Sequence, residues 1–262
     1  MTVPLVRSYA DSAVLIAGGT SGVGLATALA FADAGVRRIA LLGRNAERGA
    51  AARQQVADRC PQARVEFLAC DAAELTQVED AVGATRERLG GLDVLISSTT
   101  TAYRPELLHR TDPADLERIL VGQAVPPMLL TRTVLPHLQE QGGGSIVNIA
   151  SDAAKVPTPG EAALGAAMAA IVTFSRVAAL EAKRNGVRVN VLTPSLIAGT
   201  TTAANVLSDG FSKKLFEKAA GQAHLGVAEP GDLAAMAVFL AGPAAARVTG
   251  QAISVNGGVS IA

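Results

Sequence analysis

Several residue types that mark particular classes of protein are scarce in this chain. Of its 262 residues, two are cysteine, three are histidine and none is tryptophan. Cys60 and Cys70 do not have the spacing of metal ligands, and two cysteines are too few for a disulfide framework. The sequence therefore predicts two reduced thiols, no metal site and a cytoplasmic protein.

An excess of either charge is also lacking, because 23 basic residues balance 23 acidic ones. Nucleic acids and anionic membranes attract proteins with a basic excess. Residues 1–11 lack the apolar run of a signal peptide. We identify no apolar stretch of the roughly 20 residues that a membrane-spanning helix needs. We therefore expect no nucleic acid and no membrane as partner, but a small-molecule substrate.

Short apolar runs alternate with longer segments of helical periodicity. Continuous apolar runs are typical of strands that are buried on both faces of a parallel sheet. The predicted strands are 13–17, 38–42, 65–68, 92–96, 145–149, 187–191 and 252–255, and the predicted helices are 24–34, 45–59, 74–89, 112–141, 162–184 and 231–240. This alternation predicts one α/β domain over residues 1–262. It is a Rossmann-type doubly wound parallel sheet of about seven strands with helices on both faces.

Three segments carry further predictions. The irregular segment 198–221, rich in Thr, Ser and Ala, predicts a mobile lid with one or two helices. Pro126 and Pro127 inside the predicted helix 112–141 favour a kink. The helix 162–184 is apolar on most faces, which indicates burial in a core or at an interface.

A glycine-rich turn follows the first predicted strand. Such a turn lets backbone N–H groups approach a pyrophosphate, and the helix that follows adds the partial positive charge of its N-terminus. An ordinary tight turn is the alternative, but the strand before it and the amphipathic helix after it favour nucleotide binding. The candidate binding residues on the turn are Gly18, Thr20, Ser21, Gly22, Val23 and Gly24.

The end of the second predicted strand favours NADP(H) over NAD(H). An enzyme that selects NAD tends to place an acid there for the ribose 2′-hydroxyl, whereas this chain has Arg44 and Asn45. Arg44 is suited to a 2′-phosphate, although an exposed arginine near a helix start is the alternative. Asp71, after the third strand, either accepts a hydrogen bond from adenine or caps the next helix.

Taken together, these motifs resemble the short-chain dehydrogenase/reductase family over nearly the whole chain. The turn resembles the family's Thr-Gly-x-x-x-Gly-x-Gly motif, with Ala17 in place of the threonine. Segment 146–151 resembles the strand that ends in the catalytic serine, and segment 188–194 resembles the strand that leads to the nicotinamide loop. The resemblance implies that Asp71, Ala72, Ser97, Pro194 and Ile197 also contact the cofactor. It also implies a homotetramer or homodimer that uses the two long helices.

The chain departs from this family at the residues that carry the chemistry. The family's catalytic tyrosine and lysine fall on Leu164 and Met168, and its helix asparagine falls on Gly122. Its Asn-Asn-Ala-Gly segment is Ser-Ser-Thr-Thr at 97–100, and its Pro-Gly is Pro-Ser at 194–195. Of the four catalytic positions, only Ser151 is retained.

Other residues are candidates for the missing proton donor. A general acid contributes about 10²–10⁴ in rate, so a reductase gains much from a replacement. Tyr103, Asp152 and Glu161 are the candidates, with Lys155 and His109 on the same side of the predicted sheet. The alternative for each is a loop or capping residue.

Three functions follow from this pattern. The first is an NADP(H)-dependent oxidoreductase with a non-standard active site, acting on a carbonyl or conjugated alkene. The second is a catalytically inactive protein that senses a cofactor or stabilises a partner. The third is a non-redox isomerase, dehydratase or cyclase, whose pocket would use the hydroxyl-bearing residues Ser97, Ser98, Thr99, Thr100, Thr101, Thr200 and Thr201.

Overall fold

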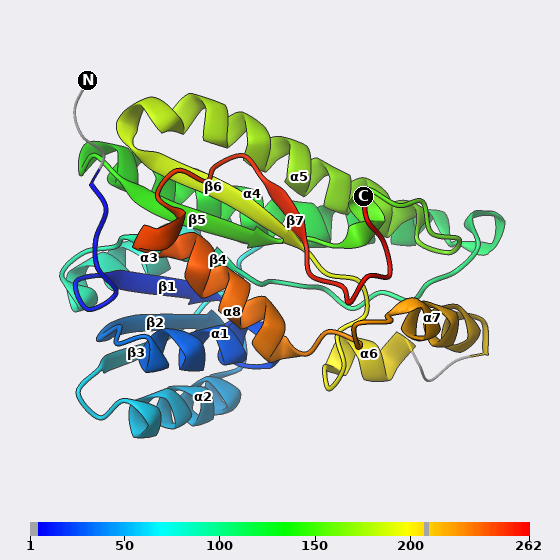
Figure 1. The fold of residues 1–262 in the computed structure, drawn as a ribbon, viewed down its shortest axis with the longest axis horizontal. Helices are drawn as coiled ribbons and strands as arrows, with labels where there is room; N and C mark the ends of the chain where they lie inside the picture. Colours follow the sequence, from blue (N-terminus) through cyan, green and yellow to red (C-terminus); the bar gives the residue numbers. More distant parts are fainter. Residues whose placement is uncertain (1–4, 207–209) are drawn as a thin grey trace.

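Seven parallel strands form one sheet in the computed structural model, which describes residues 5–206 and 210–262. The strands are β1 (Ala13–Ala17), β2 (Arg38–Gly43), β3 (Arg64–Ala69), β4 (Val94–Ser97), β5 (Gly144–Ile149), β6 (Val187–Thr193) and β7 (Ala252–Ser254). Their order is β3-β2-β1-β4-β5-β6-β7, and every neighbouring pair is parallel (Figure 1). The predicted doubly wound fold is confirmed. Its order reverses between β1 and β4, where ligands of such sheets bind beyond the carboxyl ends of the strands.

Helices cover both faces of the sheet. The α-helices of the described residues are α1 (Gly22–Asp33), α2 (Ala46–Arg59), α3 (Leu75–Leu89), α4 (Pro113–Glu140), α5 (Ala162–Ala182), α6 (Thr201–Val206), α7 (Gly210–Gln222) and α8 (Pro230–Ala241). One core cluster joins the sheet to α3, α4 and α5, and the other joins it to α1, α2 and α8. Fully buried strands such as β1, with every residue apolar, are thus covered on both sides.

Two features of the long helices bear on the predictions. α4 runs uninterrupted through the buried Pro126 and Pro127, so the kink predicted there stays a prediction. The described residues include one helix, Ala162–Asn185, that is long and apolar enough to cross a membrane. The expectation that no apolar stretch is long enough for a membrane-spanning helix is therefore wrong. The finding is weak evidence for a span, because a core helix passes as well, and residues such as Ala167 and Ile171 of α5 are buried inside the protein.

α6 and α7 stand apart from the sheet, beyond the carboxyl ends of its strands (Figure 1). They occupy most of the segment for which a mobile lid is predicted, of which residues 207–209 lie outside the described residues. Leu196, Ala203 and Phe216 form a small buried cluster there. Two helices are therefore present as expected, and the mobility of the segment stays a prediction.

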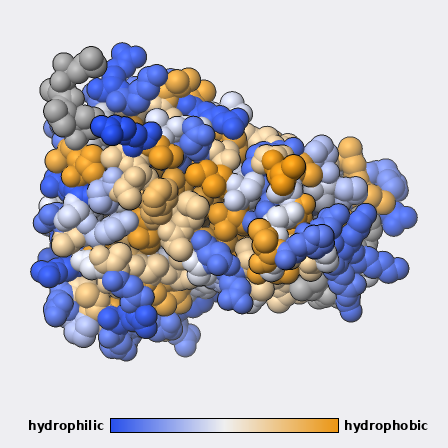
Figure 2. All heavy atoms as spheres, viewed as in Figure 1, coloured by the Kyte–Doolittle hydropathy of each residue, from blue (hydrophilic) through white to orange (hydrophobic). Residues whose placement is uncertain are grey.

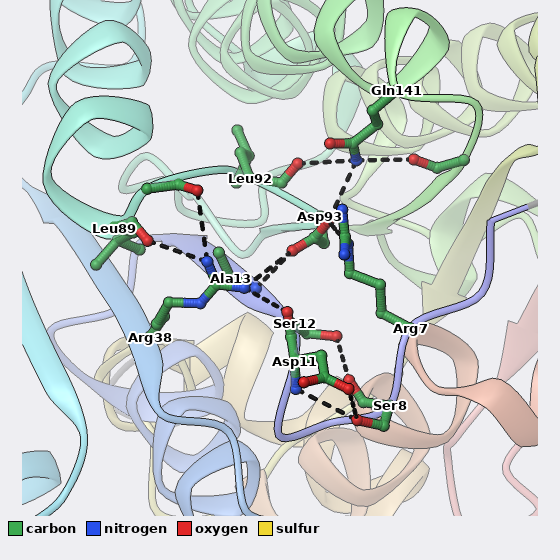
Figure 3. Close-up of polar contacts among 12 residues, drawn as sticks. Arg7, Ser8, Asp11, Ser12, Ala13, Arg38, Leu89, Leu92, Asp93 and Gln141 are labelled. Atoms are coloured by element: carbon green, nitrogen blue, oxygen red, sulfur yellow. Dashed lines mark hydrogen bonds and ion pairs between the residues drawn. The ribbon is translucent and has the colours of Figure 1, made fainter.

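A buried carboxylate joins the amino ends of the strands, on the opposite edge of the sheet (Figure 3). Asp93 precedes β4 and is 5% exposed. Its side chain accepts hydrogen bonds from the backbone N–H of Ala13 at 2.8 Å, from Arg7 Nε at 2.5 Å and from Gln141 Nε2 at 3.3 Å. The Asp93 side chain thus links β1, the segment before β1 and the C-terminal end of α4.

Apolar side chains lie across the middle of the face that α8 and β7 cover, with mostly hydrophilic residues at its edges (Figure 2). Phe239 on α8 is 43% exposed. On α5, Val177 and Leu180 are exposed as well.

Candidate functional site

A cavity of about 660 Å³ opens at the carboxyl ends of the strands, where the sheet order reverses. Its walls come from the turn after β1, the segments after β2, β3 and β4, the loops after β5 and β6, and helices α4, α5, α6 and α7. The segments whose motifs predict cofactor binding therefore all border this cavity. Of the candidate residues, those that line the cavity are Gly18, Thr20, Ser21, Gly22, Val23, Arg44, Asp71, Ala72, Tyr103, Ser151, Pro194 and Ile197.

The glycine turn forms a cradle that larger residues would fill. Gly22 begins α1 and has a φ of +51°, a left-handed conformation that favours glycine. A Cβ on Gly24 would lie 2.1 Å from the carbonyl oxygen of Gly18, so the helix packs on the turn only because no side chain is there. Gly24 does not itself line the cavity, and its role is this close packing. The turn and the N-terminus of α1 fit the pyrophosphate of a dinucleotide.

Two arginines line the cavity beyond β2. Arg44 follows the strand, and Arg48 lies in the first turn of α2. Arg48 is not among the residues predicted from the sequence. Its position four residues after Arg44 indicates a second basic side chain near the end of β2. Asn45 does not line the cavity, because its side chain caps α2 by accepting a hydrogen bond from the backbone N–H of Arg48 at 2.8 Å.

Asp71 lies opposite these arginines. Its Oδ2 is 3.9 Å from Arg44 Nη1, and its Oδ1 accepts a hydrogen bond from the backbone N–H of Ala73 at 3.1 Å. The N-cap of α3 is Glu74, so Asp71 is not the helix cap. Cys70 also lines this wall, and burial, with the charge of Asp71, raises the pKa of its thiol to about 11.

The other end of the cavity is apolar where the family has its tyrosine and lysine. Leu164 and Met168, one turn apart on α5, both line the cavity and are each 5% exposed. Ser151 lines the cavity beside them, and its Oγ accepts a hydrogen bond from the backbone N–H of Ala153 at 3.2 Å. Among the described lining residues, the charged ones are Arg44, Arg48 and Asp71, all at the opposite end.

Tyr103 and Glu161 are hydrogen-bonded to each other near this apolar end. Tyr103 Oη donates to Glu161 Oε1 at 3.1 Å, and Tyr103 lines the cavity whereas the buried Glu161 does not. Burial, with the nearby carboxylate, raises the pKa of Tyr103 well above its ordinary value. Burial also raises the pKa of Glu161, against hydrogen bonds from Tyr103 and Thr158 that lower it.

The remaining candidates for a proton donor point elsewhere. The carboxylate of Asp152 accepts hydrogen bonds from Ser254 Oγ at 3.0 Å and Ser260 Oγ at 2.7 Å, and does not line the cavity. Lys155 Nζ donates to the same Ser254 Oγ. His109 is exposed in the 3₁₀ helix η1 (Leu108–Arg110), outside the cavity lining.

Ser97 and Gln123 lie close to the loop after β4, and only Gln123 lines the cavity. Ser97, the last residue of β4, is 1% exposed and does not line the cavity, and its Oγ has no hydrogen-bond partner among the described residues. Gln123, which the sequence analysis missed, lines the wall and donates from Nε2 to the carbonyl oxygen of Thr101 at 2.8 Å. Gly122 leaves room for this loop, because a Cβ there would lie 2.9 Å from Thr101 Cγ2.

Comparisons with known proteins agree with this geometry. Residues 17–260 match the family model described as Enoyl-(Acyl carrier protein) reductase. The chain is 33% identical over 248 residues to D-threitol dehydrogenase of Mycolicibacterium smegmatis, which covers 94% of this chain and 92% of that protein. It is 30% identical over 258 residues to 2,5-dichloro-2,5-cyclohexadiene-1,4-diol dehydrogenase of Sphingobium indicum, covering 98% of this chain and 99% of that one.

Solved structures give the same result. Levodione reductase superposes with a TM-score of 0.88 at 28% identity, covering 95% of this chain and 97% of that chain. The 3-ketoacyl-(acyl-carrier-protein) reductase of Brucella melitensis, complexed with NADH, gives a TM-score of 0.86 at 27% identity and covers 97% of this chain and 100% of that one. The chain therefore belongs to the short-chain dehydrogenase/reductase family, whose members are oxidoreductases that bind nicotinamide cofactors.

Proposed function

We propose that this protein is an NADP(H)-dependent oxidoreductase with a non-standard active site, acting on a carbonyl or conjugated alkene of a neutral small molecule. One observation carries the choice of cofactor. Arg44 and Arg48 both line the cavity after β2, where an acid would select the ribose 2′-hydroxyl of NAD. Two guanidinium groups at this place favour a 2′-phosphate.

In this proposal one end of the cavity binds the phosphate groups of the cofactor, and the other end binds the substrate. The backbone N–H groups of the glycine turn bind the pyrophosphate, and the arginines hold the 2′-phosphate. When bound, the reduced cofactor supplies a hydride to the substrate. Ser151 donates a hydrogen bond to the substrate oxygen and so orients it, as an oxyanion donor does. Leu164 and Met168 exclude water from this region.

The lining also supports a neutral, largely apolar substrate. Tyr103, Leu164, Met168, Leu196 and Phe216 surround the end of the cavity that is remote from the arginines. Since no charged side chain lines that end among the described residues, a carboxylate or phosphate on the substrate would lose its hydration without gaining a partner. Apolar contacts with a few hydroxyl groups are typical of sites for small organic molecules.

A cofactor-binding protein without redox activity is the second candidate. Leu164 and Met168 favour it, because neither side chain can donate a proton or hold a ribose hydroxyl. The hydroxyl groups of the loops after β4 and β6 also line the cavity, except for Ser97, and they would equally serve a non-redox isomerase, dehydratase or cyclase. Binding of NADPH without hydride transfer to any carbonyl or alkene would favour these alternatives.

The cofactor assignment is tested by titrating the protein with NADPH and NADH and following cofactor fluorescence. The chain has no tryptophan, so protein emission contributes little background. We expect tighter binding of NADPH, and Arg44→Ala or Arg48→Ala should weaken it about tenfold, since each removes one charge-assisted contact of about 1.5 kcal/mol at an exposed site. NADH affinity should stay unchanged. Arg53→Ala, on the exposed side of α2 and outside the cavity, is the matched control. Equal losses for both cofactors would contradict the assignment.

We also propose that the protein is a homo-oligomer. Val177 and Leu180 of α5 are 47% and 62% exposed, and a second copy that packs on α5 would bury them. Light scattering during gel filtration tests this proposal. Val177→Glu with Leu180→Glu should shift the mass to that of a smaller species, and a monomeric native protein would reject the proposal.

A further inference from the structure

A phenol and a buried carboxyl group meet beside the apolar end of the cavity. They come from segments 58 residues apart: Tyr103 from the loop after β4, and Glu161 from the residue that precedes α5. The 3.1 Å hydrogen bond joins Tyr103 Oη to Glu161 Oε1. Tyr103 lines the cavity, and Glu161, 8% exposed, lies behind it.

The pair lies close to the position where the family tyrosine would stand. Glu161 is the N-cap residue of α5, three residues before Leu164. The Tyr103 ring packs against the buried cluster that contains Leu164 and Met168, and also against the cluster that contains Phe216. Tyr103 therefore lines the same part of the cavity as Leu164 and Met168.

We propose that Tyr103 donates the proton in carbonyl reduction and that Glu161, hydrogen-bonded behind it, positions the phenol and returns its proton. This proposal rests on the proposed reductase function and names its missing general acid. Tyr103 is the catalytic residue, because it lines the cavity. Glu161 is a positioning and relay residue, because it acts through Tyr103.

The proton transfers balance as follows in the direction of reduction. As the carbonyl carbon gains the hydride, the electron pair of the C=O π bond moves to the oxygen. When Glu161 is protonated, its O–H donates to Tyr103 Oη, and the phenol proton is free to turn towards the cavity. The carbonyl oxygen forms a bond to that proton, the Tyr103 O–H bond breaks, and the phenol becomes a phenolate. The carboxylic acid of Glu161 then protonates the phenolate across the hydrogen bond, and water restores the proton of the Glu161 carboxylate. The alcohol and the oxidised cofactor are the products.

The surroundings of Glu161 raise the pKa of its carboxyl group, mainly through burial. Tyr103 is the titratable group that faces it, and the Thr158 side chain in the loop before α5 acts against burial by lowering the pKa of Glu161. The neighbouring charged groups on that loop, Asp152 and Lys155, are bound to the C-terminal segment instead. Burial raises the pKa of Glu161, and the protonated acid is the form that can pass a proton to Tyr103. The rate of reduction should therefore fall as the pH rises through the raised pKa of Glu161.

The pair can be observed without any substrate, because the chain has two tyrosines and no tryptophan. In a Tyr9→Phe background, the ultraviolet absorbance of tyrosinate reports the ionisation of Tyr103 alone. Glu161→Gln should lower the pKa of Tyr103 towards its ordinary value, because the carboxylate that disfavours the phenolate is removed. Glu106→Gln, in the same loop as Tyr103 and outside the cavity lining, is the matched control and should leave it unchanged. A Tyr103 that titrates at the same pH in both variants would reject the pair.

Catalysis is tested with NADPH and a panel of neutral ketones, namely acetophenone, benzylacetone and decalone. Tyr103→Phe should lower kcat about a hundredfold or more with little change in KM, as expected for the loss of a general acid. Tyr9→Phe removes a hydroxyl group outside the cavity, which donates to the carbonyl oxygen of Val238 at 3.0 Å, and should retain native activity. Glu161→Gln should abolish the fall in rate with pH.

The results of these assays distinguish a failure of the Tyr103 proposal from a failure of the proposed reductase function. If the native protein reduces a ketone and Tyr103→Phe is equally fast, Tyr103 is not the donor and the reductase function stands. If the native protein binds NADPH and reduces none of the ketones, carbonyl reduction is rejected together with its proton donor. If Glu161→Gln lowers the rate equally at every pH, its carboxyl group does not relay protons.

Discussion

Asp93 offers a sharp test of how the fold is held together, because it lies on the opposite edge of the sheet from the cavity. The perturbation is Asp93→Ala. The side chain is 7% exposed and accepts from the backbone N–H of Ala13, which is fully buried, and from Arg7 and Gln141 (Figure 3). Alanine fills none of these roles, so the donors at the start of β1 lose their acceptor.

The magnitude follows from burial. Leaving the Ala13 N–H without a partner costs about 1–3 kcal/mol. The ion pair with Arg7 adds about 1 kcal/mol after screening, because the Arg7 side chain is 37% exposed. The sum is about 3 kcal/mol, which corresponds to a fall in Tm of about 6–12 °C for a chain of this size. Asp93→Asn retains one oxygen acceptor for Ala13 and should lose about half as much.

Thermal unfolding followed by circular dichroism measures these differences, with Asp11→Ala as the control. Asp11 accepts from Ser8 in an exposed position, so its loss should change Tm little. Affinity for NADPH should be equal in all variants that remain folded, because the cavity lies at the other ends of the strands. Equal unfolding temperatures for Asp93→Ala and Asp11→Ala would show that the Asp93 carboxylate does not stabilise the start of β1.

Three further predictions concern the cavity. Gly24→Ala should abolish NADPH binding in a titration while the protein stays folded, because the new Cβ would lie 2.1 Å from the carbonyl oxygen of Gly18; undiminished affinity would contradict the role of the cradle. Glu161 has a raised pKa in the folded state, so its stabilising contribution is complete at low pH and is lost as the pH rises through that pKa. The Tm of Glu161→Gln relative to the native protein should therefore be higher at a pH above the raised pKa of Glu161 than at a pH below its ordinary value of 4.5, and a constant difference would refute this. Leu164→Tyr combined with Met168→Lys should raise ketone reduction in an NADPH oxidation assay, because both positions line the cavity; a folded, NADPH-binding double variant without any gain would show that the rest of the site is not competent.

The sequence predicts the architecture well because the local composition of a segment indicates whether it forms a buried strand. β1 is buried along its whole length, and its apolar run indicates this directly. β6 is buried along its whole length as well, although Arg188 and Asn190 alternate with its apolar residues. Boundaries are less predictable, since they depend on contacts made elsewhere. β4 begins at Val94 rather than two residues earlier, where the buried Asp93 side chain binds the start of β1. Similarly, α1 begins at Gly22, within the turn itself.

Local motifs likewise identify the cofactor end of the cavity. They do not indicate hydrogen bonds between residues that are far apart in the sequence. The glycine turn and Arg44 are recognisable from a few consecutive residues. Nothing near Asp152 in sequence indicates that its partners lie about a hundred residues later, in the C-terminal segment. The hydrogen bond between Tyr103 and Glu161 is of the same kind. Sequence reasoning named both residues separately as donors, and only the fold brings them together.

The proposed function requires redox chemistry in this cavity with Leu164 and Met168 in place of a tyrosine and a lysine. Its most direct test is to incubate the native protein with NADPH deuterated at the nicotinamide C4 and the neutral ketones, and to locate deuterium in the alcohol by mass spectrometry. We expect deuterium at the carbinol carbon, transferred from one face of the cofactor only. Tight binding of NADPH with no deuterium in any product would contradict it.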